Sequence, residues 1–164
     1  MGLSQPARLL FLILTLALFK SNSTYAQKKL IATIDSFCKQ VDLDTTIKWK
    51  TIDKDVIQKN NLCVCNDMTY HSRNDTVFKV TSYVLHIAIS SSEYYFKDRK
   101  LTLVISTKRH DGKSINQTKY YFTNDKLLKT VVLVGNKPKD NKESTQDILK
   151  NAQTYIKFLL VNEE

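Results

Sequence analysis

The chain has 164 residues, of which three are glycine, and a formal net charge of +9 at pH 7. So few glycines leave no glycine-rich loop of the kind that cradles phosphate, which excludes the common nucleotide-binding motifs. The lysines are spread along the chain without a run of five or more, so a basic tail is excluded, and this dispersed charge is more typical of solubility than of a dedicated anionic partner.

The N-terminal segment predicts a secretory signal. Residues 9–19 are apolar apart from Thr15, and they are bounded by Arg8 and Lys20. A helix of this length rises about 16 Å, whereas the hydrocarbon core of a membrane is ~30 Å thick. The segment is therefore typical of the apolar part of a signal peptide, and an uncleaved anchor is the less favoured alternative.

A cleavage site follows this segment. Thr24 and Ala26 place small side chains before Gln27, which is the pattern that signal peptidases accept. We expect residues 1–26 to be removed, which leaves residues 27–164 as a single domain that is periplasmic or secreted and has no transmembrane span. Loss of the two basic residues of the signal lowers the net charge from +9 to about +7.

The first element expected in the mature chain is an amphipathic helix over residues 29–41, because apolar residues recur there every three or four positions. These residues are Leu30, Ile34, Phe37, Cys38 and Val41. Residues 42–61 show no single periodicity. Ile47, Trp49 and Ile52 fit a short strand and residues 53–59 fit a helical turn, so the structure of this segment is left open.

Between residues 68 and 134 the hydrophobic pattern alternates with a period of two, which predicts strands. One long central strand is expected over residues 76–90, because this segment is rich in β-branched and aromatic residues and the serines at 90–92 end it. The chain then returns in strands over residues 94–96, 101–107, 115–122 and 127–134, with polar turns at 97–99, 111–112 and 123–125.

A repeated motif supports this series of hairpins. Two tyrosines and a phenylalanine are followed by three polar residues and then by lysine and leucine, and the motif recurs after 26 residues. Its copies begin at Tyr94 and Tyr120, and a weaker third copy begins near Met68. Each copy reads as a strand, a tight turn and a second strand, so the copies predict an antiparallel meander.

The C-terminal segment returns to a helical pattern. Ile148, Leu149, Ala152, Tyr155, Ile156, Leu159 and Leu160 form one broad apolar face over four turns. Both amphipathic helices and the sheet have an apolar face, and each such face is stabilised when another element buries it. We therefore expect an α+β domain, an antiparallel β-meander covered on one face by an N-terminal and a C-terminal amphipathic helix.

The repeated motif resembles a group of uncharacterised secreted proteins and lipoproteins of Bacteroidota, in which an N-terminal helix, Tyr-Tyr-Phe-x-Asn-Gly-Lys-Leu hairpins and a C-terminal helix follow one another. The likeness covers residues 30–160. The chain departs from the group's pattern where Arg99 and Asp125 replace the turn glycine, where a tryptophan after the last Lys-Leu is absent, and where no lipidation cysteine occurs. The resemblance implies a periplasmic or envelope location and no particular chemistry.

Three cysteines remain in the mature chain, and in an oxidising compartment an odd number leaves at least one thiol without an internal partner. Cys63 and Cys65 on a strand would point to opposite faces, so a bridge between them is disfavoured. A disulfide of Cys38 with Cys63 or Cys65 is one hypothesis, and three partly buried thiols are an equally acceptable one.

Cys63, Cys65 and His71 also have ligand types that bind zinc or copper. A structural metal site needs four ligands and a fourth is not evident nearby, so neither a metal nor another cofactor is expected. For nucleophilic catalysis the cysteines would need a histidine base, but His86 falls within a strand and His110 in a turn. No catalytic motif occurs and no enzymatic activity is expected. A thiol- or metal-dependent activity centred on Cys63, Cys65 and His71 is the alternative.

The tyrosines suggest a binding surface. Adjacent residues on a strand point to opposite faces, so one ring of each pair would be exposed and could join nearby lysines in an aromatic and basic platform. The candidate binding residues are Tyr94, Tyr95, Tyr120, Tyr121, Lys100 and Lys126. Cross-strand packing of the rings is the alternative that we favour. The expected function is a non-enzymatic binding or structural module of the periplasm or cell envelope. Its expected partner is an envelope protein, a peptide or an anionic glycan, and not nucleic acid.

Overall fold

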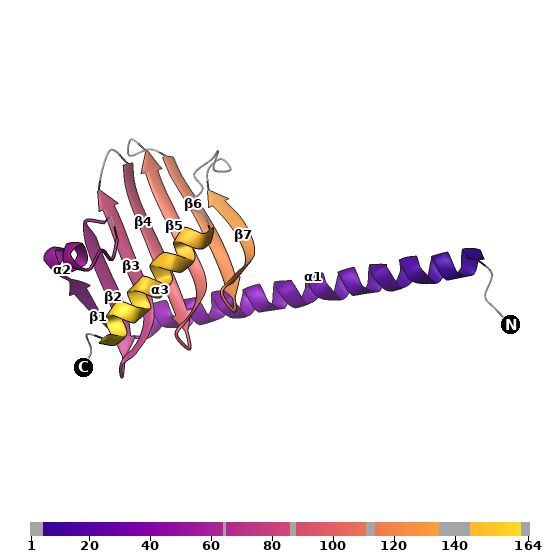
Figure 1. The fold of residues 1–164 in the computed structure, drawn as a ribbon, viewed down its shortest axis with the longest axis horizontal. Coiled ribbons are helices and arrows are strands. Elements are labelled where there is room, and N and C mark those ends of the chain that lie inside the picture. Colours follow the sequence, from indigo (N-terminus) through magenta and orange to yellow (C-terminus); the bar gives the residue numbers. More distant parts are fainter. Residues whose placement is uncertain (1–4, 64, 86–87, 111–113, 135–144, 162–164) are drawn as a thin grey trace. The chain divides into compact units, whose positions relative to one another are not determined.

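Seven antiparallel strands form one sheet in the computed structural model, which describes residues 5–63, 65–85, 88–110, 114–134 and 145–161 (Figure 1). The strands are β1 (Lys48–Ile52), β2 (Asp67–Arg73), β3 (Thr76–Leu85), β4 (Ala88–Lys97), β5 (Lys100–His110), β6 (Ser114–Thr123) and β7 (Lys126–Val134). Their order in the sheet is their order in the chain. The predicted antiparallel meander is therefore confirmed, together with the α+β class.

In the described part of the chain, three helices accompany the sheet: α1 (Gln5–Leu43), α2 (Lys54–Lys59) and α3 (Thr145–Val161). The chain divides into two units, Met1–Ser36 and Phe37–Glu164. The first unit consists of α1 up to Ser36, and the second holds the sheet, α2, α3 and the last residues of α1. Within the described ranges no helix is both long enough and apolar enough to cross a membrane. The cleavage expected after residue 26 stays a prediction.

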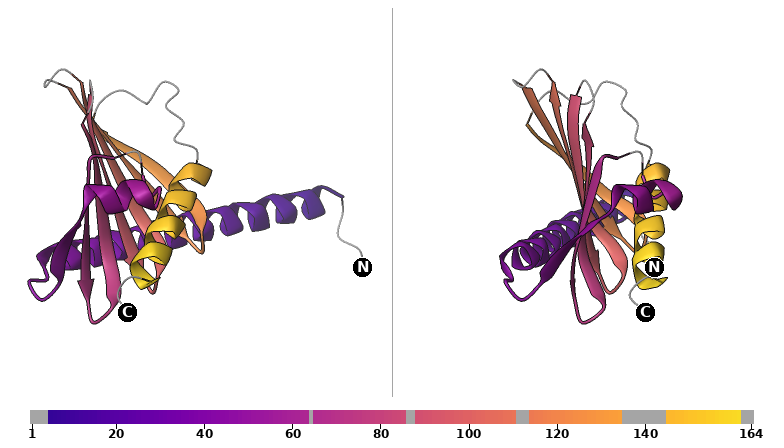
Figure 2. Two further views of the ribbon diagram at one scale, coloured as in Figure 1. Left: turned by 60° about the vertical axis from the view of Figure 1, so that its left-hand side comes forward. Right: turned by 90° about the vertical axis from the view of Figure 1, so that its left-hand side faces the viewer.

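The main core lies between one face of the sheet and the helices α2 and α3, which both cover that face (Figure 2). The alternation of side chains along each strand sends every second residue into this core. From the strands these residues are Ile52, Met68, Tyr70, Val77, Val80, Tyr94, Phe96, Leu101, Val104 and Phe122. This face is called the α3 face below.

Helix α3 forms as its apolar periodicity predicts. Its fully buried residues are Ile148, Ala152, Tyr155 and Leu159, spaced by four, three and four positions along one stripe. Burying a side chain of the size of Ile148 stabilises the fold by about 1.5 to 3 kcal/mol. The ring of Tyr155 meets that of Tyr94 edge to face, with centroids 5.1 Å apart, so the helix is fixed to β4.

The last residues of α1 contact the opposite face of the sheet. Asp42 lies within hydrogen-bonding distance of Tyr95, whose neighbour Tyr94 points to α3. Adjacent residues of a strand face opposite ways, so Asp42 and Tyr155 lie on different sides of the sheet. The expectation that the N-terminal and C-terminal helices cover the same face is not confirmed.

The predicted single strand over residues 76–90 is wrong. β3 ends at Leu85 and β4 begins at Ala88, and the two pair so that Leu85 lies opposite Ile89. The serines at 90–92 are thus part of β4 and do not end a strand. They fit there because Ser82, Ser92 and Ser106 lie directly opposite one another on three neighbouring strands, where small hydroxyl residues pair well.

The segment left open by the sequence holds β1 and α2. Asp53 is the N-cap of α2, since its Oδ1 accepts a hydrogen bond from the backbone N–H of Asp55 at 2.8 Å. Ile57 of this short helix is fully buried in the core. Both elements suggested by the local pattern are therefore present, and burial of Ile57 anchors them to the sheet.

Candidate functional site

The tyrosines expected to form a platform are mostly buried. Tyr94 lies in the core under α3, and Tyr95 on the opposite face is equally buried. Tyr121 is also buried, while Tyr120 is half-buried and packs against the α3 face. An exposed aromatic platform built from these four rings is thus absent, because both faces of the central strands are covered where the rings lie. Tyr94 packs on Tyr155 of α3, and Tyr95 contacts Asp42 of α1 and Lys79 of the neighbouring strand.

The two candidate lysines, Lys100 and Lys126, are exposed at the beginnings of β5 and β7. They follow the hairpin turns at Asp98–Arg99 and Asn124–Asp125. Lys100 lines a groove, whereas Lys126 does not line that groove. Of the six candidates, Lys100 is therefore the one that lines this groove.

This depression, called the α3 groove, lies between α3 and the two hairpin turns and has a volume of about 340 Å³. Its apolar residues are Phe96, Leu101, Leu149, Ala152, Ile156 and Leu160. Its polar residues are Arg99, Lys100, Asp125, Gln153 and Lys157. Three cations and one carboxylate make its rim net positive, and the volume falls within the range of small-molecule sites.

The turns that border the groove have a backbone conformation that also occurs at Asn74–Asp75, the turn between β2 and β3. Both central residues of each turn have positive φ: 52° and 62° at Asp98 and Arg99, and 48° and 58° at Asn124 and Asp125. Two such residues make a type I′ turn, in which glycine is the least strained second residue. Here the second residue carries a side chain, and in both turns that residue lines the groove.

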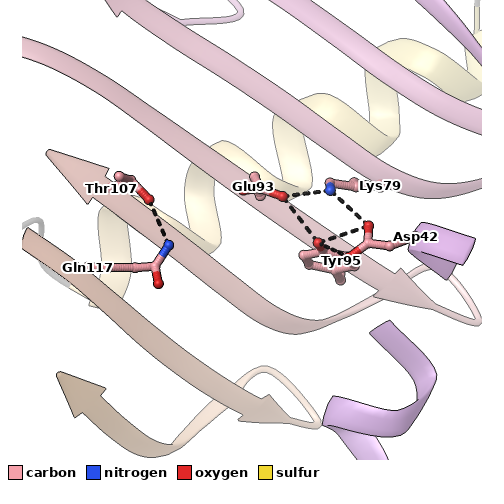
Figure 3. A network of polar contacts seen from close by, with 6 residues as sticks. All are labelled: Asp42, Lys79, Glu93, Tyr95, Thr107 and Gln117. Carbon is pink, nitrogen blue, oxygen red and sulfur yellow. Dashed lines mark hydrogen bonds and ion pairs between the residues drawn. The ribbon is translucent and has the colours of Figure 1, made fainter. Parts of the chain in front are cut away.

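A polar cluster lies on the opposite face, where the end of α1 meets β3 and β4 (Figure 3). The ammonium of Lys79 lies 2.9 Å from Asp42 Oδ1 and also contacts Glu93. The Tyr95 hydroxyl is 3.0 Å from Asp42 Oδ2 and 3.1 Å from Glu93 Oε2, and it donates its single proton to one of them at a time. The cluster fastens the last turn of α1 to the sheet.

The electrostatics of this cluster hold its donors protonated. Burial alone would lower the pKa of Lys79, but hydrogen bonds to Glu93 and Asp42 outweigh it and raise that pKa. Burial, together with the two carboxylate charges, also raises the pKa of Tyr95. Neither group becomes a base or a nucleophile near neutral pH, so this cluster acts as a structural fastening.

The cysteines pair differently from the hypothesis. Cys63 and Cys65 form a disulfide with Cα atoms 5.2 Å apart, and both pack against the α3 face of the sheet. Cys38 is buried one helical turn before Asp42, which contacts the opposite face. The sheet therefore separates Cys38 from the other two, and neither of the two hypotheses, a disulfide of Cys38 with one of them or three separate thiols, is correct.

The alternative centre of Cys63, Cys65 and His71 is not assembled. The disulfide ties up both sulfurs, and His71 faces Lys79 across the strands on the other side of the sheet. Among the residues that the structure describes, no group of three or more potential ligands gathers around a common point. His86 lies outside the described residues, and His110 is the last residue of β5.

The contribution of α3 to the groove was missed from the sequence. The apolar face of α3 has seven residues, but only four of them form the fully buried stripe. The remaining three, Leu149, Ile156 and Leu160, line the groove. An apolar face broader than one buried stripe is the signal that would have indicated a second contact.

No protein-family model matches the chain, and neither a curated protein nor a solved structure does. The resemblance of the hairpins beginning at Tyr94 and Tyr120 to secreted proteins of Bacteroidota stays a prediction.

Proposed function

We propose that the mature chain is an exported, non-enzymatic binding module of the periplasm or cell envelope, and that its ligand site is the α3 groove. The ligand class is an amphiphilic anion, an apolar chain that ends in a carboxylate or a similar acid group. The apolar chain lies on the floor of the groove, and the acid group lies at the basic rim. The export part of this proposal rests on residues 9–26 and on the resemblance of the hairpins.

The groove itself is the observation that carries the proposal. Leu149, Ile156 and Leu160 are apolar side chains that the core does not fully cover, and they border an open volume of about 340 Å³. An apolar ligand gains free energy there by leaving water, at about 0.8 kcal/mol for each buried methylene. The ammonium of Lys100 and that of Lys157 then favour an anionic end over a cationic one.

Backbone strain next to the groove gives further support. Arg99 and Asp125 have positive φ at positions where glycine would remove the strain, and both side chains reach the groove. Residues with a strained backbone cluster at functional sites, and here the same strain also occurs at Asn74–Asp75, outside the α3 groove. Their place at the groove is consistent with a role in choosing the ligand.

The test is isothermal titration of the purified protein with octanoate and decanoate, with acetate and decyltrimethylammonium as controls. Two additional methylenes should tighten binding about tenfold from octanoate to decanoate. Acetate lacks the chain and decyltrimethylammonium has the opposite charge, so both should bind far more weakly. Equal affinity for decanoate and decyltrimethylammonium would refute the proposal.

Variants locate the site. Ile156→Asn should weaken decanoate binding about tenfold by making the floor polar, and Lys100→Gln together with Lys157→Gln should abolish the preference for the anion. Lys150→Gln is the matched control, because Lys150 is exposed on α3 and does not line the groove. Decanoate binding that survives Ile156→Asn unchanged would place the ligand elsewhere. Export is checked separately by the N-terminus of the protein recovered from the envelope, expected at Gln27.

A further inference from the structure

The first edge of the sheet carries a group of features that the α3 groove does not explain. β1 (Lys48–Ile52) pairs with β2 on one side and is the end of the strand order. Its first four residues, Lys48, Trp49, Lys50 and Thr51, are all exposed. The outer side of an edge strand offers unpaired backbone N–H and C=O groups to another extended chain.

Two lysines of this edge point to the same face. Lys48 and Lys50 are two residues apart on a strand, so their side chains share a face, and the Nζ of Lys50 lies 5.9 Å from the centroid of the Tyr70 ring. Both line a polar depression of about 360 Å³ together with Arg73. Within the described ranges neither lysine ammonium takes part in an ion pair.

Arg73 is fixed in place beside them. Its Nη1 lies 2.9 Å from Asp44 Oδ2 and 2.8 Å from Thr46 Oγ1. Asp44 offsets part of this guanidinium charge, and Asp75 is the one carboxylate that lines the depression. The two lysine charges are therefore left for a partner, and the depression is complementary to carboxylates.

Trp49 lies between the two lysines and points to the other face of the strand. Its side chain is 68% exposed, although tryptophan is among the residues that gain most from burial. Exposed tryptophans are typical anchors of binding surfaces. A partner that covers Trp49 would bury a large apolar area beside the two charges.

We infer that β1 binds an extended peptide segment as an added strand, and that this segment carries the pattern acidic, apolar, acidic. Residues opposite each other in paired strands point to the same face, so two acidic residues two positions apart meet Lys48 and Lys50. The apolar residue between them then covers Trp49. The same lysines repel a basic strand, which gives the edge its selectivity.

This binding mode explains why the partner is a peptide and not another polyanion. A glycan or nucleic acid can neutralise the lysines, but it has no alternating N–H and C=O groups to pair with the edge of β1. Lys48 and Lys50 lie two residues apart on one face of β1. A partner matches this spacing when its own side chains alternate between two faces, as they do in an extended peptide. The site is independent of the α3 groove.

Trp49 is the only tryptophan of the chain, so its fluorescence reports directly on this edge. The probe is the blocked peptide Ser-Thr-Glu-Leu-Glu-Thr-Ser, titrated into the purified protein at low salt. Addition should shift the emission of Trp49 to shorter wavelengths in a saturable way. The permuted peptide Ser-Thr-Leu-Glu-Glu-Thr-Ser has the same composition but cannot place both carboxylates on one face, and it should bind about tenfold more weakly.

The variant K48E/K50E should reduce affinity for the first peptide at least about tenfold, and added salt should weaken binding to the unaltered protein. The matched control is K126E/K129E, which makes the same charge change at exposed positions of β7, the opposite edge of the sheet. That variant should bind as the unaltered protein does.

Backbone pairing is tested with the same peptide N-methylated at alternate residues, which removes its donors toward one side. At least one of the two N-methylation registers should abolish the emission shift. Three results would overturn the inference. The first is equal affinity for the two peptide sequences, and the second is full binding of both N-methylated forms. The third is displacement of the peptide by dextran sulfate together with an equal loss of peptide affinity in the two charge variants.

Discussion

At the scale of single residues, Tyr95 shows how an aromatic residue on the second face of the sheet is stabilised. Its ring is buried and lies 4.7 Å from the Nζ of Lys79, measured to the ring centroid. Its hydroxyl lies between the carboxylates of Asp42 and Glu93. A buried hydroxyl needs such a partner, because an unsatisfied one would cost about 1 to 3 kcal/mol.

A double-mutant cycle on Tyr95 and Asp42 measures this contact. Tyr95→Phe removes the hydroxyl and Asp42→Asn removes the charge, and we expect a coupling of about 1 to 2 kcal/mol in the free energy of unfolding from urea denaturation. Tyr95→Phe with Glu93→Gln is the companion cycle on the other carboxylate. Additive effects in both cycles would show that the hydroxyl contributes nothing through these carboxylates.

His71 predicts how stability changes in mild acid. Burial lowers its pKa from 6.5, and the charge of Lys79 directly across the strands lowers it further, against the opposing carboxylates of Asp42 and Glu93. Because the folded pKa lies below the unfolded value, the neutral ring contributes stability that is fully present above pH 6.5. This contribution is lost as the pH falls through the lower folded pKa.

The comparison that isolates this effect is His71→Gln against the unaltered protein. Between pH 7.5 and about 5 the unaltered protein should lose more unfolding free energy than the variant, because only the unaltered protein must protonate the half-buried imidazole. Chemical denaturation at each pH gives both curves. Parallel curves would mean that His71 does not titrate differently in the folded and unfolded states.

At the scale of elements, two of the hairpin turns were located correctly from the sequence, while the turn expected at 111–112 lies outside the described residues. Polar residues between alternating segments placed reversals at 97–99 and 123–125, and the structure has them at Asp98–Arg99 and Asn124–Asp125. The sequence shows that the second position of each turn is not glycine. Only the backbone of the structure shows the consequence, which is a positive φ in a residue that carries a side chain.

Asp125→Gly should raise the free energy of unfolding by about 0.5 to 1 kcal/mol, because glycine adopts a φ of 58° without strain. The greater conformational entropy of glycine in the unfolded chain offsets part of this stabilisation. Asp125→Ala removes the same carboxylate but keeps the Cβ, so it should give no such gain. Thermal unfolding of the two variants separates the backbone effect from the charge effect. Equal stability of both variants would argue against backbone strain at this turn.

The strand boundaries show where a local pattern is insufficient. Residues 76–90 have the composition of one continuous strand, and only pairing with β4 shows that β3 ends at Leu85. Serines usually indicate a break, but here Ser92 is paired between Ser82 and Ser106. Cross-strand register depends on residues far apart in the sequence, so composition within one window cannot supply it.

At the scale of the whole molecule, cover on both faces of the sheet decides which predicted site residues are accessible. The sequence identified the tyrosines and two lysines beside them, Lys100 and Lys126, and the structure shows these two lysines to be exposed. It could not show that helical segments lie over both faces at Tyr94 and Tyr95, which removes the rings from solvent. The groove was missed for the same reason, because it exists only where α3 meets two turns.

The Cys63–Cys65 disulfide and the burial of Cys38 predict how many thiols of the protein react and under which conditions. Denaturation without reductant, followed by N-ethylmaleimide, should give one adduct for each chain, at Cys38, because Cys63 and Cys65 are joined. Without denaturant Cys38 should react far more slowly because it is buried. Peptide mass mapping identifies the site. Three adducts would show that the disulfide is absent, and an adduct at Cys63 or Cys65 alone would show a different pairing.

The strictly sequential order of the strands also governs how the chain acquires its structure. Every strand pairs with one that precedes or follows it directly, so each hairpin can form without waiting for distant segments, and low contact order favours rapid assembly. The apolar side of the sheet is different, because α3, which covers it, follows all seven strands in the chain and therefore leaves the ribosome after them. Until then this surface is exposed to aggregation, and a chain truncated before Thr145 would keep it exposed permanently.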